Sequence, residues 1–157
     1  MMEPQELRDL IKSTLTPLGL YSPEAEELLM ATAAQESHLG TYRQQIGGPA
    51  LGIFQMEPAT FNDIWANYLH YKHPLSDNIR ALATHGFVIA GELVNNDPFA
   101  IAMARAQYLR APEALPPAGD LCAIWTLYKL RWNTPLGAAT KDQFFANYRK
   151  YVDGPAV

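Results

Sequence analysis

Apolar residues recur every three or four positions along most of this chain, which is the spacing of one face of an α-helix. In residues 3–18 the apolar stripe ends at Leu18 and is followed by Gly19, a common helix stop. This pattern predicts an amphipathic helix, and similar patterns predict helices over residues 22–37, 59–69, 78–95, 97–109, 120–132 and 140–152.

Residues that favour helix ends lie at several of these boundaries. Ser22 is expected to be an N-cap, because Pro23 follows it at the first helical position, where proline is common. Asp97 is expected to cap the helix that follows it. Thr140 and Gln143 have the spacing of a capping box. These residues indicate where the predicted helices begin.

The predicted fold is therefore all-α, a single compact domain of about seven helices that spans residues 1–157. No pair of segments has the alternation and turn of a convincing β-hairpin, and the loop after residue 37 is the best place for a short β excursion. Residues 78–95 are expected to form a buried helix in which Gly86 and Gly91 permit close packing. Residues 153–157 are expected to form a loose tail.

The composition and the net charge exclude some classes of function. The 157 residues are 48% hydrophobic and 18% charged, which is typical of a folded globular domain, and the net charge is −4. An acidic chain lacks the strongly basic footprint of nucleic-acid binding, and no apolar run is long enough to span a membrane. We expect a monomer that binds no nucleic acid and does not insert into membranes.

The cysteine and histidine content predicts no cofactor and no metal. Cys122, the only cysteine, lies in an apolar run and is expected to be a buried thiol. His70 and His73 lack a third ligand nearby and are expected to be solvated, and His85 is expected to be partly buried in its helix. His38 follows a candidate acid closely and could tune it.

That candidate acid is Glu36, which lies where the second helical pattern ends. The carbonyl groups at a helix C-terminus disfavour a carboxylate, and burial by apolar neighbours such as Leu39 or Phe54 would also raise its pKa. A carboxyl group that is protonated near neutral pH can act as a general acid. The alternative is a solvated surface glutamate, which is more common at such a position.

The loop after Glu36 favours the functional alternative. It is rich in glycine, and Arg43 is its only formal charge between Ser37 and Met56. Glycines such as Gly52 permit a tight path in which backbone groups approach a ligand.

Two stretches resemble the first two motifs of the soluble lytic transglycosylase and goose-type lysozyme superfamily, which cleaves bacterial peptidoglycan. They are Glu36-Ser37 and the run Gly-x-x-x-Leu-Gly52-Ile-Phe-Gln55-Met-x-Pro-x-Thr. The resemblance implies a lysozyme-like fold with Glu36 as the catalytic acid and base. It also implies that Ser37, Gly52 and Gln55 bind or position the sugar.

A third stretch is similar in a degenerate form to the family's Ala-Tyr-Asn motif, which a glycine follows closely. Here Trp132-Asn133 stands in that place, at the end of a predicted aromatic stripe with Trp125 and Tyr128. Such a stripe is more often core than ligand platform. The resemblance implies sugar contacts for Trp132 and Asn133, and Tyr128 could instead point to Glu36.

The number of carboxylates decides the product. Inverting and retaining glycosidases use two carboxyl groups, but the loop between the first two motifs has no acid. Glu57 is the nearest along the chain, and the sequence does not place Asp63 or Asp97. The absence of an acid in the loop, taken alone, favours a lytic transglycosylase with a 1,6-anhydro product. A bound water would instead give lysozyme-type hydrolysis.

The leading hypothesis is cleavage of the β-1,4 bond between N-acetylmuramic acid and N-acetylglucosamine during phage-induced lysis. A wall-binding virion or secretion-system component with little or no cleavage is the alternative from another class, and a chitin-active glycosidase is a third. The first residues do not have the pattern of a signal peptide, so we expect synthesis in the host cytoplasm and action at the cell wall. A holin is then a candidate partner for release.

Overall fold

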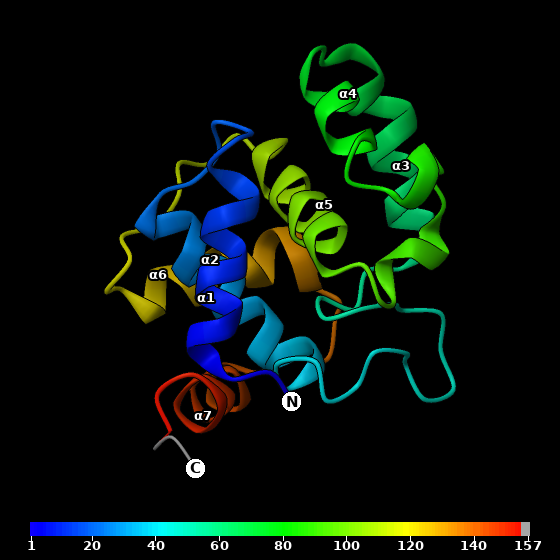
Figure 1. The fold of residues 1–157 in the computed structure, drawn as a ribbon. Helices are drawn as coiled ribbons and strands as arrows, with labels where there is room; N and C mark the ends of the chain where they lie inside the picture. The colour runs from blue at the N-terminus through cyan, green and yellow to red at the C-terminus, as the bar shows by residue number, and fades with distance from the viewer. Residues whose placement is uncertain (155–157) are drawn as a thin grey trace.

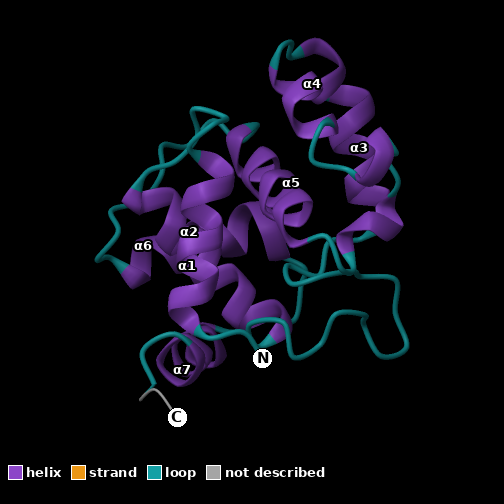
Figure 2. Cartoon of the chain, viewed as in Figure 1, coloured by secondary structure: helices purple, strands orange, loops and turns teal. Residues whose placement is uncertain are grey.

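The computed structural model describes residues 1–154, and in that range it is all-α with no strand (Figures 1 and 2). The α-helices are α1 Pro4–Leu15, α2 Pro23–Ser37, α3 Pro58–Asn67, α4 Leu75–Arg80, α5 Asp97–Leu109, α6 Leu121–Tyr128 and α7 Lys141–Tyr151. The shorter helical turns are η1 Leu69–Tyr71, η2 Thr84–Gly86, η3 Ala90–Leu93 and the π-helical turn η4 Lys129–Asn133. This confirms the predicted all-α class. Pro155, Ala156 and Val157, most of the predicted tail, lie outside the described residues.

Side-chain caps fix several helix starts as the sequence predicts. The Ser22 hydroxyl accepts a hydrogen bond from the Ala25 backbone N–H at 3.1 Å, and the capping box of Thr140 and Gln143 forms in both directions. At α5 the cap lies one residue earlier than expected. The Asn96 side chain, rather than Asp97, accepts from the Phe99 backbone N–H at 3.1 Å.

The predicted buried helix over residues 78–95 is wrong. Only residues up to Arg80 are α-helical, and the rest of the segment forms two short 3-10 turns separated by extended residues. His85 and Gly86 have φ of 55° and 72°, which cannot continue a right-handed helix. Phe87 and Ile89 are exposed, so apolar content alone gave the wrong prediction.

α2 is the central helix, and side chains on all its sides contribute to one buried core. Every residue from Leu28 to Ala34 is buried and all but Thr32 are apolar, as expected of a helix covered on every side. In Figure 1, α1 and α6 lie beside it, α7 lies at the lower end, and α5 separates this group from α3 and α4. The chain thus has a main body and a smaller part formed by α3 and α4.

The glycine-rich loop of residues 40–57 contains no regular strand but has two isolated antiparallel bridges. Leu51 pairs with Gln44 and with Met56. The expected β excursion is limited to these contacts.

Two further predictions about single side chains are wrong. Cys122 is exposed rather than buried, because it lies on the outer side of α6. His85 is also exposed, in a turn instead of a helix. Within residues 1–154 no helix has the length and apolar character needed to cross a membrane.

Candidate active site

Glu36 lies in the last turn of α2, at the floor of a cleft of about 520 Å³. The helix ends at the next residue because His38 takes a left-handed conformation, with φ of 52°. The Glu36 carboxyl group is half-buried, and its Oε2 accepts a hydrogen bond from the Tyr128 hydroxyl at 2.5 Å. Within the part of the chain that the structure describes, Glu36 Oε1 has no protein partner.

The environment of Glu36 lets the carboxyl group keep its proton in a large fraction of the molecules at neutral pH. Burial raises the pKa of Glu36 to about 7, and the hydrogen bond from Tyr128 acts in the opposite direction. Burial also raises the pKa of Tyr128, so this phenol stays protonated and donates to Oε2. Oε1, which has no partner among the described residues, is the oxygen that can present the proton of the acid to a ligand.

The cleft brings together residues from four parts of the chain. Three predicted site residues line it with Glu36: Gln55, Trp132 and Asn133. Helices α3 and α5 and the residue that follows α5 supply most of the remaining polar lining: Thr60, Asp63, Gln107 and Arg110. The sequence did not identify Gln107, Arg110 or Arg131, because nothing in their own helices marks them as functional.

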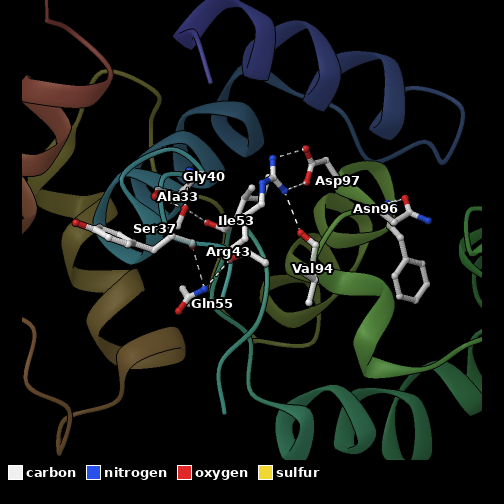
Figure 3. Close-up of polar contacts among 12 residues, drawn as sticks. Ala33, Ser37, Gly40, Arg43, Ile53, Gln55, Val94, Asn96 and Asp97 are labelled. Carbon is white, nitrogen blue, oxygen red and sulfur yellow. Dashed lines mark hydrogen bonds and ion pairs between the residues drawn. The ribbon is translucent and has the colours of Figure 1, made fainter. Parts of the chain in front are cut away.

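Ser37 holds the loop in place and does not line the cleft. Its side chain is fully buried, donates to the Ile53 carbonyl at 2.6 Å and accepts from the Gly40 backbone N–H at 2.8 Å (Figure 3). Because every contact of the hydroxyl is with the protein, direct sugar binding by Ser37 is not supported. Ser37 is a positioning residue that ties the loop to the end of α2.

Gln55 is held in one orientation at the edge of the cleft. Its Nε2 donates to the Gly52 carbonyl at 2.9 Å and to the Tyr42 carbonyl at 3.2 Å (Figure 3). Both amide hydrogens are therefore used, and Oε1 is the end that can accept from a ligand. Gln55 has φ of 50°, a left-handed conformation that is uncommon for residues other than glycine.

Gly52 is required for packing rather than for ligand contact. It is buried with φ of 80°, and a Cβ built there would lie 2.1 Å from the Leu93 carbonyl oxygen. The predicted substrate contact of Gly52 is thus replaced by close approach of the loop to η3.

The aromatic residues of the third stretch divide between core and cleft. Tyr128 is fully buried and contacts Glu36, as one of the two sequence alternatives expected. Trp132 is half-buried, stacks on Tyr108 with ring centroids 5.3 Å apart, and leaves part of its surface in the cleft. The π-helical turn gives Trp132 and Asn133 their position beyond α6.

Arg43 anchors the same loop at a second point. Its guanidinium binds both carboxylate oxygens of Asp97 at 2.6 and 3.0 Å and donates to the Val94 carbonyl at 3.0 Å (Figure 3). In the sequence Arg43 stands out only as the single charge of the loop, and neither its anchoring role nor its partner was predicted. Asp97, considered as a second carboxylate, is committed to this ion pair.

Two other carboxylates line the cleft. Glu57 is exposed at the start of α3, and Asp63 projects from the same helix. Asp63 accepts from Asn67 and forms an ion pair with Arg110 at 2.6 Å, and these contacts lower its pKa. Asp63 is therefore ionised at neutral pH, in the same cleft as Glu36, which at that pH keeps its proton in about half of the molecules.

His38 is not placed to tune Glu36. Its ring stacks on Tyr151 with centroids 4.5 Å apart, and its Nδ1 is 3.1 Å from the Tyr151 hydroxyl. Within residues 1–154, no group of three His, Cys, Asp or Glu side chains could hold a metal ion.

Comparisons with protein-family models, with curated proteins and with solved structures find no match to this chain. The interpretation of the cleft therefore depends on its own geometry and on the motifs at residues 36–60.

Proposed function

We propose that this protein is a peptidoglycan glycosidase that cleaves the β-1,4 bond between N-acetylmuramic acid and N-acetylglucosamine, with Glu36 as general acid and base. The observation that carries the proposal is a half-buried carboxyl group with a pKa of about 7 in an open cleft of about 520 Å³. A cleft of this size accommodates a few sugar rings, and the motif resemblance supports the same substrate.

The proposed reaction begins with transfer of the Oε1 proton from Glu36 to the glycosidic oxygen. The bond between that oxygen and the anomeric carbon breaks, and its electron pair remains on the oxygen. The oxygen of a nucleophile then bonds to the anomeric carbon, and the Glu36 carboxylate removes the proton of that nucleophile. If this is the muramoyl C6 hydroxyl, the product is a 1,6-anhydro sugar, and if it is water, the product has a reducing end.

The remaining cleft residues are proposed to bind the glycan. Trp132 offers an aromatic face, Gln55 Oε1 can accept from a hydroxyl or amide N–H, and the Asn133 amide can bind the acetamido group. Tyr128 supports the reaction by holding Glu36 Oε2. No metal or cofactor is needed for these steps.

Asp63 is relevant to whether the proposed reaction ends in hydrolysis or in an anhydro product. An ionised carboxylate in the same cleft could activate water, which favours hydrolysis, whereas the acid-free loop favours the anhydro product. Mass spectrometry of the released muropeptides separates the two. If Asp63 acts as base, Asp63→Asn should reduce formation of reducing ends by at least about 100-fold, while Glu57→Gln serves as a control on the same helix.

Loss of turbidity of outer-membrane-permeabilised cells tests the proposed cleavage itself. Glu36→Gln should abolish lysis and retain the helical circular dichroism spectrum of the wild type. A wild-type protein that sediments with peptidoglycan but releases no muropeptide would instead support the wall-binding alternative, and release from chitin alone would support the chitinase alternative.

The cellular setting is part of the same proposal. We place the protein as a phage lysin that is made in the host cytoplasm and reaches the wall through a holin-dependent step. Expression in a bacterial host with and without a co-expressed holin tests this, because lysis should depend on the holin.

A further inference from the structure

Lys129 forms an unusual set of hydrogen bonds beside the cleft. Its ammonium group donates to Asn133 Oδ1 at 2.6 Å, to the Gly137 carbonyl at 2.8 Å and to the Ala139 carbonyl at 3.1 Å. All three donors of the ammonium group are therefore used, and every acceptor is neutral. A lysine held in this way organises the chain around it.

The loop of residues 134–139 closes around the oxygen end of the Asn133 amide. A Cβ built at Gly137 would lie 2.3 Å from Asn133 Oδ1 and 2.4 Å from the Asn133 backbone oxygen. The Gly137 backbone N–H also donates to the Thr134 carbonyl at 3.0 Å. Asn133 Oδ1 is thus enclosed by Lys129 and by a loop that only glycine permits to approach so closely.

The other end of the amide is consequently directed to the cleft. Because Oδ1 accepts from Lys129, Nδ2 is the end that remains for a ligand, and Asn133 lines the cleft with Glu36. The Asn133 amide therefore presents a hydrogen-bond donor to the cleft.

The side-chain amide of Gln55 is oriented in the opposite sense to that of Asn133. Its Nε2 is bound to two backbone carbonyls, so it presents an acceptor where Asn133 presents a donor. A ligand that fits both amides needs an acceptor on one side and a hydroxyl or N–H donor on the other.

We propose that Lys129 is a positioning residue that fixes Asn133 as a hydrogen-bond donor and thereby selects sugars that carry an acetamido carbonyl. This inference rests on the proposed function in that it assigns a substrate group to the same cleft. Lys129 does not touch the substrate, and its effect is on which ligand is preferred. Rotation of the Asn133 amide, once Lys129 is removed, would place an acceptor where the carbonyl oxygen binds.

The test measures binding of two uncharged ligands of equal length and linkage, chitotetraose and cellotetraose, by isothermal titration calorimetry. Cellotetraose has a hydroxyl group where chitotetraose has the acetamido group. The background is Glu36→Gln, which prevents cleavage. The added substitutions are Lys129→Met, which removes the donors, Lys129→Arg, which retains them, and Lys12→Met, which removes an exposed charge outside the cleft.

The Glu36→Gln protein should bind chitotetraose at least about tenfold more tightly than cellotetraose. Lys129→Met should reduce this ratio about five- to tenfold. The change corresponds to the loss of one neutral hydrogen bond to the acetamido carbonyl and to the mispairing of that carbonyl with a rotated Asn133 amide. Lys129→Arg should restore most of the ratio, and Lys12→Met should leave it unchanged. Since neither ligand is charged, a change in the ratio is not a Coulombic effect.

An unchanged ratio in folded Lys129→Met would overturn the inference, and so would equal binding of both ligands by Glu36→Gln alone. A loss of affinity for both ligands in parallel would mean that Lys129 has only a structural role. These outcomes are separate from the proposed function, because wild-type turbidity loss tests cleavage. A protein that selects chitotetraose but releases no muropeptide would retain this inference and lose the enzymatic proposal.

Discussion

Glu36 combines burial with a single hydrogen bond, and these two influences determine its protonation. Burial disfavours the charged form and dominates, so the pKa is raised to about 7. The same burial that makes Glu36 an acid at neutral pH also destabilises the folded protein once the group ionises.

We predict that Glu36→Gln stabilises the protein at pH 8 while it removes activity. Between the ordinary pKa of 4.5 and about 7 the folded state binds more protons than the unfolded state, so stability falls as pH rises. The amide cannot ionise and avoids a loss of about 1–3 kcal/mol, allowing for partial exposure of the carboxyl group. Urea unfolding at pH 4 and pH 8 measures this, and equal stability of the two proteins at both values would contradict it.

Tyr128 provides a second prediction at the residue scale. Its hydrogen bond lowers the pKa of Glu36, so Tyr128→Phe should raise that pKa above 7. In the proposed mechanism the protonated form is active, and kcat/KM falls as pH rises through the pKa. The falling limb of the pH profile should therefore move to higher pH in Tyr128→Phe, together with a loss of rate of about tenfold or more. A limb at the wild-type position would show that Tyr128 does not control the acid.

At the scale of elements, the site depends on how one loop is attached to helices formed elsewhere in the chain. Ser37 connects residues 40–57 to the end of α2, and Gly52 lets the loop touch η3. These contacts place Gln55 beside Glu36 in the cleft.

Gly52 and Gly47 form a matched pair for a prediction about this attachment. Both have positive φ, 80° and 72°, but a Cβ at Gly52 meets the Leu93 carbonyl while a Cβ at Gly47 meets nothing within 4 Å. Gly47→Ala should cost about 1 kcal/mol of backbone strain. Gly52→Ala should cost about 1–3 kcal/mol more because the loop must move. Chemical denaturation gives both values, and equal losses would show that close approach to Leu93 is unimportant.

The pair of Arg43 and Asp97 acts at the scale of the whole molecule, since it links the loop after α2 to the start of α5. Both side chains are partly buried, and two hydrogen bonds join them. A double-mutant cycle with Arg43→Met and Asp97→Asn should give a coupling energy of about 1–2 kcal/mol, larger than that of an exposed pair. Coupling near zero in 0.15 M salt would show that the ion pair does not hold the loop, which would then depend on its other contacts, among them those of Ser37 and Gly52.

Sequence reasoning was most reliable where local chemistry decides the structure. The caps at Ser22 and Thr140 and the amphipathic stripe of α1 operate within one or two turns of helix, so they could be identified from neighbouring residues. It failed over residues 78–95, where apolar composition resembled a buried helix. There α4 ends at Arg80, and the positive φ angles of His85 and Gly86 exclude a right-handed helix further along the segment. Apolar composition does not reveal such angles.

The sequence by itself determined the helical class and singled out Glu36, Gln55, Trp132 and Asn133, because periodicity and motif spacing are properties of the linear chain. Only the tertiary structure decided that these four side chains share one cleft. It also decided that Asp63 and Arg110 join them there and that Lys129 sets the Asn133 amide. The reason is physical: burial, pKa and hydrogen-bond polarity depend on neighbours that are distant in sequence, and the fold alone brings them together.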